Sequence, residues 1–440
     1  MLVGTIKMKP NRLLYLILLF VFLLVVHRIN PLGPTDEELS LLLLQAAEAG
    51  ETKQVNSLIA KGADVNATGE FGLTALHEAA MRGHKNVVKL LIENGANVNI
   101  LSELGRTPLH DAVSWGHEDI VALLIGSGAN INEKDGRGEN TALHYAAQEG
   151  FVDIAKLLIN NGAVVDVMNW RGITPLHQAA IIGNIDLVNL FSSKIPKIDS
   201  QNQVNNTLLH YAVEHRHNDL VAILIDKGAD VEKKTEYGNT PLHIAARNGS
   251  SETVELLIAK GAGVNVKDKS GNTPLHEAIA WGHFIDVVKI LIEHSADINL
   301  KNHDGWTPLH EACASGHPRD AIMQVDKDIA EILMRKGAEV NVQDNNGSTP
   351  LHNAVIYGDQ DLVKLLLDNG ADINVKDKDG RTPLFEAVFY NNKENVKLLI
   401  SHGADVNIKS SGQTPLEAAK AHGRVEIAHL LKAAGALESH

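Results

Sequence analysis

The hydrophobic and polar positions of this chain form two regions with different patterns. Residues 13–26 are apolar without interruption, whereas the sequence from residue 37 onward repeats one alternation of short apolar runs and polar segments. In each repeat the first run has the spacing i, i+3, i+4, as in Leu109, Ala112 and Val113, which predicts one buried helical face. A second apolar run and a polar segment follow. The pattern therefore predicts pairs of helices joined by polar turns.

The start and end signals of these helices are visible in residues 106–129. Thr107 is suited to cap the first helix and Pro108 to occupy its first position, because that position needs no backbone donor. Gly116 is placed to end the helix. Asp135-Gly136 lies in the polar segment that follows the second apolar run and predicts a turn. Each unit is thus expected to contain a first helix, a second helix and a turn.

One sequence, close to Thr-Pro-Leu-His, opens eleven of these units with a period near 33 residues. The opening threonines are Thr74, Thr107, Thr141, Thr174, Thr207, Thr240, Thr273, Thr307, Thr349, Thr382 and Thr414. Nine openings end in histidine, namely His77, His110, His144, His177, His210, His243, His276, His310 and His352, whereas Phe385 and Glu417 depart from the pattern. This motif and period resemble the ankyrin repeat. The resemblance covers residues 37–440 and implies an all-α solenoid of helix pairs with β-turn fingers, in which the motif histidines are structural.

The resemblance gives a domain plan of about twelve repeats. Residues 37–66 lack the threonine opening and are expected to cap the N-terminal end, and residues 412–437 carry several polar helix positions that suit a C-terminal cap. Residues 31–36 are expected to be a linker, and residues 1–30 a membrane anchor or a signal sequence that contains a hydrophobic helix. Isolated repeats cannot bury their apolar faces, so the stack as a whole is expected to form the core.

Two repeats break the pattern. Residues 190–206 lack the usual Gly-Ala-Asp-Val-Asn ending, so their second helix is expected to end early. This repeat is interpreted as a decayed but stacked unit, with a hinge as the alternative. A nine-residue insertion, residues 318–326, is expected to lengthen the loop between two helices. Such insertions are usually tolerated without a role, and contact with a partner is the alternative.

The apolar run from Leu13 to Val26 has two main interpretations. Fourteen helical residues span about 21 Å, short of a bilayer core of about 30 Å, but basic flanks that include Arg12 and Arg28 can reach the interface. We therefore favour an uncleaved single-pass anchor. A cleaved signal is the alternative because the length and basic start fit, although no small-residue cleavage site follows; an ordinary helix is the third. The charge distribution favours a cytoplasmic N-terminus with the repeats across the membrane.

Composition and charge exclude several classes of function. The net charge is −14, although residues 1–30 hold four basic residues and no acidic one, and such an acidic body is a poor general binder of nucleic acid. With Cys313 as the sole cysteine, neither an intramolecular disulfide nor a cysteine-rich metal site is possible. The His-Glu pairs lack the second histidine of a zinc protease, and no phosphate-binding loop occurs. The sequence therefore predicts no catalysis, no cofactor, no metal and no small-molecule substrate.

The aromatic residues suggest where a partner binds. In the family that this chain resembles, the first helices and turns line a concave face that binds other proteins. Ten aromatic residues are expected there: Trp115, Tyr145, Trp170, Tyr211, Tyr237, Trp281, Trp306, Tyr357, Phe389 and Tyr390. Tryptophan and tyrosine dominate the energetics of protein interfaces. Packing against neighbouring repeats is the alternative for each of them.

Acidic residues are expected on the same helical face as these aromatic residues. They are Glu78, Asp111, Glu149, Glu214, Glu277, Glu311 and Glu386. A partner with a basic, or mixed basic and aromatic, surface is therefore favoured.

The sequence leads to one favoured function and several alternatives. We favour a membrane-anchored repeat protein that binds other proteins through its concave face without catalysis. An exported, signal-cleaved protein that binds foreign or host proteins is one alternative. A passive stabiliser of a neighbouring enzyme is another, and a secreted or cytoplasmic location stays open. An enzyme is disfavoured, because no segment outside the repeats is long enough to form a catalytic domain.

Overall fold

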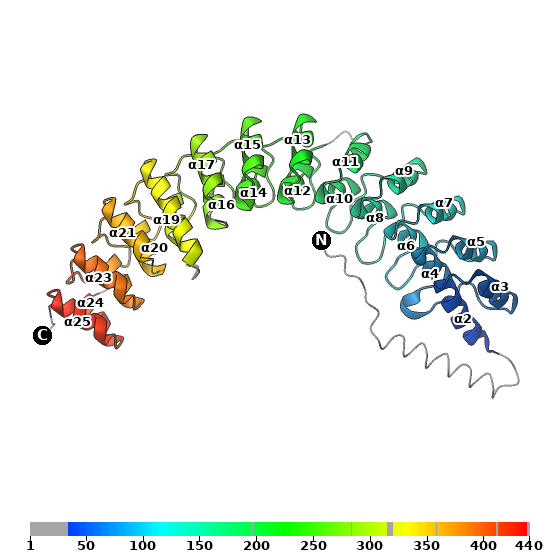
Figure 1. The fold of residues 1–440 in the computed structure, drawn as a ribbon, viewed down its shortest axis with the longest axis horizontal. Coiled ribbons are helices and arrows are strands. Elements are labelled where there is room, and N and C mark those ends of the chain that lie inside the picture. Colours follow the sequence, from blue (N-terminus) through cyan, green and yellow to red (C-terminus); the bar gives the residue numbers. More distant parts are fainter. Residues whose placement is uncertain are drawn as a thin grey trace. The chain divides into compact units, whose positions relative to one another are not determined.

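The computed structural model describes residues 34–194, 198–282, 284–314, 320–357, 359–410 and 412–437. Within these ranges the chain forms 24 α-helices and the short 3-10 helix Glu70–Gly72, with no strand and with two isolated β-bridges at the bases of turns (Figure 1). The prediction of an all-helical solenoid is confirmed for this part of the chain. The predicted membrane segment from Leu13 to Val26 lies outside the described residues. Among the helices inside them, none combines the length and apolar character needed to cross a bilayer.

The chain divides into two compact units. Unit 1 comprises residues 1–179 and 186–195, and unit 2 comprises residues 180–185 and 196–440. The division falls in the repeat whose Gly-Ala-Asp-Val-Asn ending is missing. The second helix of that repeat, α11 (Ile185–Ser192), has eight residues where α9 (Val152–Asn160) has nine, in agreement with the early end that we predicted.

Unit 1 is a stack of helix pairs in two layers. The first helices are α2 (Asp36–Glu48), α4 (Ala75–Arg82), α6 (Pro108–Ser114) and α8 (Ala142–Glu149). The second helices are α3 (Thr52–Ala60), α5 (Lys85–Glu93), α7 (Glu118–Gly126) and α9 (Val152–Asn160), and α10 (Pro175–Ile182) spans the division between the units. Each first helix packs on the next first helix, and the second helices pack on one another in the same way.

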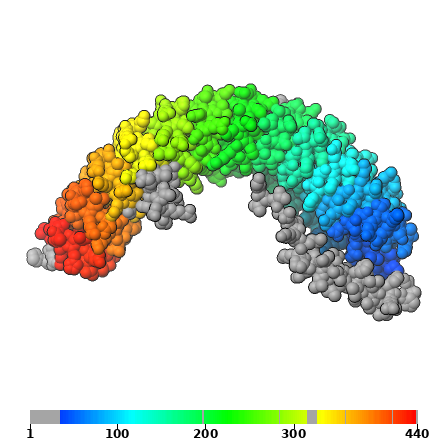
Figure 2. Space-filling model, in the orientation of Figure 1, coloured from blue at the N-terminus to red at the C-terminus, as the bar shows by residue number. Residues whose placement is uncertain are grey.

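Unit 2 continues the same plan over seven helix pairs. Its first helices are α12 (Leu208–Glu214), α14 (Pro241–Asn248), α16 (Pro274–Ala280), α18 (Pro308–Ala314), α20 (Pro350–Tyr357), α22 (Pro383–Phe389) and α24 (Pro415–Ala421). Its second helices are α13 (Asn218–Asp226), α15 (Ser251–Ala259), α17 (Ile285–Glu293), α19 (Asp320–Arg335), α21 (Gln360–Asp368), α23 (Lys393–Ser401) and α25 (Val425–Ala433). The order of the repeats within each unit follows the sequence (Figure 2).

The helix signals in the sequence explain these boundaries. In α6 the Thr107 hydroxyl accepts a hydrogen bond from the His110 backbone, Pro108 occupies the first turn, and Gly116 follows the helix with a φ of 77°. That left-handed conformation favours glycine, which has no Cβ to clash. The predicted core residues Leu109, Ala112 and Val113 are buried. The small side chain of alanine lets neighbouring first helices approach closely.

The prediction that the insertion at residues 318–326 forms a loop is wrong. We expected a longer loop, but α19 begins at Asp320 and runs for 16 residues, against nine for α17 and α21. The inserted residues from Asp320 to Asp326 are therefore helical. Adding residues to an existing helix requires no new nucleus, and this stretch contains neither glycine nor proline, so extension of the helix is favoured over a loop.

Candidate protein-interaction face

The motif histidines join each repeat to the next. In the first opening, the Thr74 backbone N–H donates to Nδ1 of His77 over 3.2 Å, and Nε2 of His77 is 3.0 Å from the carbonyl oxygen of Arg106 in the following repeat. Because Nδ1 accepts, Nε2 carries the proton and donates. His144, His210, His243, His276, His310 and His352 make the same two contacts. The structural role that the resemblance implied is thus observed.

Burial keeps these histidines neutral. It lowers the pKa of His110, His144, His210, His243, His276 and His310 to about 4 from a usual 6.5. In the folded state a proton on Nδ1 would also face the threonine N–H donor. Between pH 6.5 and 4 the unfolded chain binds more protons at these sites, so their contribution to stability falls as the pH drops through that window. The histidines are therefore part of the scaffold and are poorly placed for catalysis at neutral pH.

The turns, which we call fingers, are also joined to one another. The Gly136 N–H donates to the Leu104 carbonyl over 2.9 Å, and equivalent backbone bonds link most neighbouring fingers of each unit. In unit 2, long side chains add a second connection, which we call the finger row. Gln201, Lys234, Lys267, Lys301, Gln343 and Lys376 each donate to a backbone carbonyl of the next finger over 2.6–3.2 Å. The fingers of unit 2 are thus fixed by both backbone and side chains.

Seven of the ten predicted aromatic residues are exposed, at two places on the repeat. Trp115, Trp281, Tyr357, Phe389 and Tyr390 lie at the C-terminal ends of first helices, and Trp170 and Tyr237 lie on fingers. Trp281 leaves 68 % of its surface exposed and Tyr237 leaves 69 %. A first helix of seven or eight residues separates the two places by about 11 Å. These side chains therefore stand at opposite margins of the face formed by the first helices and fingers, which we call the inner face.

The other three predicted aromatic residues are engaged within the chain. The Tyr145 hydroxyl donates to Asp135, and the guanidinium of Arg106 lies 4.5 Å from the centre of its ring. The Tyr211 hydroxyl accepts a bond of 2.7 Å from the Asn202 amide. These rings are half-buried and held by the finger of their own repeat.

Trp306 is the third of this group. Its indole N–H donates to Asp344 over 3.0 Å, and its ring stacks on His310 with the ring centres 6.4 Å apart. Packing between neighbouring repeats, the alternative that we stated for each aromatic residue, describes Trp306 and the contact of Tyr145 with Arg106. Tyr211 is instead held by Asn202 in the finger of its own repeat.

The sequence analysis missed several exposed apolar residues on the fingers of unit 1. Phe71, Leu101 and Met168 are 57 %, 50 % and 45 % exposed. Leu101 and Met168 stand where the finger row of unit 2 has lysine or glutamine, and comparing the repeats position by position would have revealed them. Both side chains lack a donor for the carbonyl of the next finger.

The structure corrects the expected acidic strip at three of its seven positions, whereas Glu149 and Glu214 are exposed. Asp111, Glu277 and Glu386 are buried instead of lining an exposed surface. Each lies near an arginine of the same unit: Arg106 is 2.8 Å from Asp111, Arg247 is 3.4 Å from Glu277, and Arg381 is 3.1 Å from Glu386. Position in the repeat predicted the shared helical face, but only folding brought the arginines beside the acids. The buried carboxylates are thus largely committed to ion pairs.

Glu311 differs from these acids in its electrostatic surroundings. Burial, together with the nearby carboxylates of Glu277 and Asp304, raises the pKa of Glu311 to about 7. Burial also raises the pKa of Asp111, but the Arg106 charge opposes that change. Near neutral pH, the charge of Glu311 is therefore sensitive to its surroundings.

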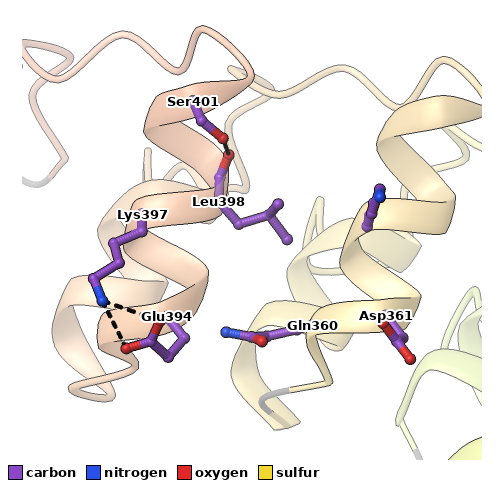
Figure 3. A pocket seen from close by; sticks show the side chains of 7 residues that line it. Gln360, Asp361, Glu394, Lys397, Leu398 and Ser401 are labelled. Carbon is purple, nitrogen blue, oxygen red and sulfur yellow. Dashed lines mark hydrogen bonds and ion pairs between the residues drawn. The ribbon is translucent and has the colours of Figure 1, made fainter.

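Another concave feature lies on the layer of second helices of unit 2. A polar pocket between α21 and α23, on the layer of second helices, is lined by Gln360, Asp361, Lys364, Glu394, Lys397, Leu398 and Ser401 (Figure 3). The Lys397 ammonium is 2.9 Å from Glu394, and Asp361 is 3.5 Å from Lys327. The charges of Asp361, Glu394 and Lys397 are thus paired within the pocket or with a neighbouring helix. Within the described ranges, no group of three potential metal ligands converges.

The comparison with protein families agrees with the observed architecture. A model described as ankyrin repeats in three copies matches residues 43–135, 136–202, 176–268, 254–323, 319–410 and 375–437. A search of curated proteins gives no match to this chain. The matched segments run almost without a break from residue 43 to residue 437, which is most of the chain. The chain therefore belongs to the ankyrin-repeat family.

Proposed function

We propose that this protein binds other proteins through its inner face, the concave face expected for the family, and that it catalyses no reaction. The observation that carries the proposal is the set of exposed aromatic side chains at the margins of this face. Large exposed tryptophan and tyrosine side chains are uncommon on non-interacting surfaces, and they supply much of the energy of interfaces. The two-layer stack presents them on rigid helix ends and fingers.

We further propose that the segment from Leu13 to Val26 anchors the protein in a membrane, with a cytoplasmic N-terminus and the repeats on the far side. The support is the length of the apolar run and its basic flanks. An exported protein that acts on foreign or host proteins, and a passive stabiliser of a neighbouring enzyme, remain the alternative functions. Protein binding is common to the favoured function and to both alternatives.

Site-specific photo-crosslinking in the source cells tests the binding proposal. A photo-reactive phenylalanine analogue would replace Trp115, Trp281 or Tyr237 on the inner face, and Glu255 or Lys289 on second helices as matched exposed controls. We expect discrete crosslinked proteins from the inner-face positions and none from the controls. Equal crosslinking from both sets, or none from either, would contradict the proposal.

Protease protection of intact membrane compartments tests the anchor. We expect the repeats to be protected and to stay in the pellet after an alkaline carbonate wash. Digestion from the cytoplasmic side would refute the proposed orientation. Release of a protein shortened by its N-terminal segment would identify the exported form instead.

A further inference from the structure

The fingers of unit 1 expose apolar side chains at the margin where the described chain begins. Phe71, Leu101, Met168 and Trp170 lie on fingers of this unit, and all four are exposed. We propose that these side chains, which we call the apolar finger patch, insert into the surface of the lipid bilayer that holds the anchor. This inference rests on the proposed membrane anchor and adds a second contact between the protein and that membrane.

Helix α2 places the start of unit 1 beside the first finger. It has 13 residues, against eight for α4, and the two helices are followed by the equivalent glycines Gly50 and Gly83, with φ values of 74° and 80°. The additional residues therefore extend the N-terminal end of α2 by about 8 Å. In α4 that end meets the preceding finger at Thr74. In α2, the Cδ1 of Leu44 would lie 2.9 Å from a Cβ on Gly69, which belongs to the first finger. The chain thus enters unit 1 at the finger margin.

The length of chain before α2 limits the distance between the proposed anchor and this margin. Residues 27–34 separate Val26, the end of the apolar run, from Thr35, the N-cap of α2. These residues span at most about 29 Å, even when fully extended. First helices in contact lie roughly 10 Å apart, so the fingers of Phe71 and Leu101, before α4 and α6, lie about 10 and 20 Å along the stack from α2. The bilayer that holds the anchor is therefore within reach of these fingers.

Backbone hydrogen bonds join the fingers of the patch into one row. The Glu103 N–H donates to the Phe71 carbonyl over 2.9 Å. The bond donated by the Gly136 N–H continues the row, and the Trp170 N–H donates to the Gly138 carbonyl over 3.2 Å. Because neighbouring fingers are fixed to one another, their apolar side chains can meet an extended surface together. A bilayer is such a surface.

The position of the patch along the chain also favours the membrane as its occupant. Leu101 and Met168 replace the lysine or glutamine that the finger row has throughout unit 2. In that unit the row side chains are bound to carbonyl groups of the next finger, and a lysine ammonium is costly to insert into the apolar part of a bilayer. The apolar residues at the row position therefore occur in the unit that directly follows the anchor.

The charges and residue types of these fingers suit a neutral lipid interface. Exposed side chains of both signs surround the patch, and the Lys134 ammonium is 2.9 Å from the Glu139 carboxylate, so no single sign of charge selects the occupant. The guanidinium of Arg171 lies 4.8 Å from the centre of the Trp170 ring. Tryptophan is typical of the membrane interface, and arginine beside it can bind a lipid phosphate. The contact should therefore depend on apolar side chains and require no anionic lipid.

Fluorescence quenching in vesicles tests the inference with the full chain. The protein, with Cys313→Ala to match Ala147 at the equivalent position of another repeat, would be reconstituted into phosphatidylcholine vesicles that contain a spin-labelled lipid. A nitrobenzoxadiazole probe on Glu103→Cys reports lipid contact at the patch. Matched exposed controls carry the probe on Asn56→Cys, in α3 of the repeat nearest the anchor, or on Lys269→Cys, on a finger of unit 2.

We expect the spin-labelled lipid to quench the Glu103→Cys probe and to leave both control probes unquenched. Adding Phe71→Ser, Leu101→Ser and Trp170→Ser should reduce this quenching at least about twofold, because these side chains supply the apolar contact. Adding Tyr237→Ser, which removes an exposed ring from a finger of unit 2, should leave the quenching unchanged, and so should added salt. The substituted side chains are exposed, so all variants should keep the circular dichroism spectrum of the wild type.

An alkaline carbonate wash of the same vesicles separates failure of this inference from failure of the anchor. A protein that resists the wash while its Glu103→Cys probe stays unquenched would overturn the finger contact, keep the anchor, and leave the patch to the protein partners of the inner face. Quenching in a protein that the wash removes would support the finger contact and refute the anchor. A protein that binds no vesicles would refute both. Equal quenching of all three probes, or quenching unaffected by the serine substitutions in the patch, would also overturn the inference.

Discussion

Neighbouring fingers carry different side chains at the same position in the two units. In unit 2 the finger row of lysine and glutamine donates to one carbonyl after another, from Gln201 to Lys376. In unit 1, Lys134 makes the equivalent bond to the Met168 carbonyl over 3.0 Å, but Leu101 and Met168 are apolar and exposed. The backbone bonds between fingers occur in both units, so the scaffold does not require the side-chain row. The residue at this position can therefore differ between units. Lysine or glutamine fixes neighbouring fingers, whereas leucine or methionine presents an apolar surface.

The inner faces of the units differ in the same way. Unit 2 concentrates exposed aromatic residues at the ends of first helices, whereas unit 1 exposes apolar residues mainly on its fingers. The ion pairs of the buried acids also differ. In unit 1, Arg106 pairs with the single acid Asp111, whereas in unit 2, Arg381 is shared by three carboxylates. One repeat sequence thus supports two different surfaces, because the motif residues build the stack and the remaining positions are free to vary.

The largest expected effect comes from removing an arginine beside a buried acid. Arg106→Met leaves the buried Asp111 without its ion pair, which should cost about 3–5 kcal/mol of unfolding free energy. Arg381→Met removes the partner of two buried carboxylates, Asp377 and Glu386, and should cost at least as much. Urea unfolding followed by circular dichroism measures both. The double variant Arg106→Met with Asp111→Asn should recover part of the loss, and no recovery would show that the guanidinium acts mainly by packing.

The next effect concerns the closest approach of two fingers. A Cβ on Gly105 would lie 2.3 Å from the Gly136 backbone nitrogen, and Gly105 has a φ of 68°. Gly105→Ala should therefore destabilise unit 1 by about 2–4 kcal/mol. Gly347→Ala in unit 2, where the closest backbone atom is 2.8 Å away, should cost less. Gly128→Ala shares the positive φ but meets open space, so it isolates the cost of the backbone conformation. Equal melting temperatures for all three variants would contradict this order.

A smaller, pH-dependent effect is expected at Glu311. Its pKa of about 7 exceeds the usual 4.5, so its contribution to stability is present at low pH and is lost as the pH rises through 7. Glu311→Gln should therefore stabilise the protein by about 1 kcal/mol at about pH 8 and by much less at about pH 5. In unit 1, Asp111→Asn should instead destabilise, because Arg106 would lose its partner. Thermal melts across this pH range test both, and a pH-independent change in Glu311→Gln would refute the assignment.

The smallest effect tests the finger row directly. Lys267→Leu removes a donor to the Lys301 carbonyl and should cost about 0.5–1 kcal/mol, since the bond is exposed. Leu101→Lys adds the missing donor in unit 1 and should gain about 0.5 kcal/mol or less. Hydrogen exchange of the finger amides reports the change locally. If Leu101→Lys weakens binding in the crosslinking experiment while stabilising the fold, the apolar residues of unit 1 serve recognition.

Much of the architecture could be predicted because its signals are local. Threonine caps, proline at the first helical position and glycine after the helix act within a few residues, and the apolar spacing of α6 identifies its buried face directly. The motif histidines were correctly assigned a structural role from the family resemblance. The insertion at residues 318–326 was wrongly expected to form a loop, because the sequence gives the length of the insertion but does not decide between loop and helix.

The candidate site was less predictable because exposure depends on residues in other repeats. The sequence could not separate Trp281, which is exposed, from Trp306, whose indole N–H reaches Asp344 in the following repeat. It also placed the acids on one helical face without showing that arginines neutralise several of them. These contacts join residues from different parts of a repeat or from neighbouring repeats, so no local pattern contains them.

The sequence by itself determined the repeat, its helix boundaries and the glycines and histidines that the stack requires. Those features follow from backbone conformation and from hydrophobic periodicity within one repeat. The tertiary structure decided which aromatic side chains remain exposed, which acids are buried beside arginine, and where the finger row is interrupted. The physical reason is that burial and pairing are properties of the packed stack, in which each repeat forms part of the surroundings of its neighbours.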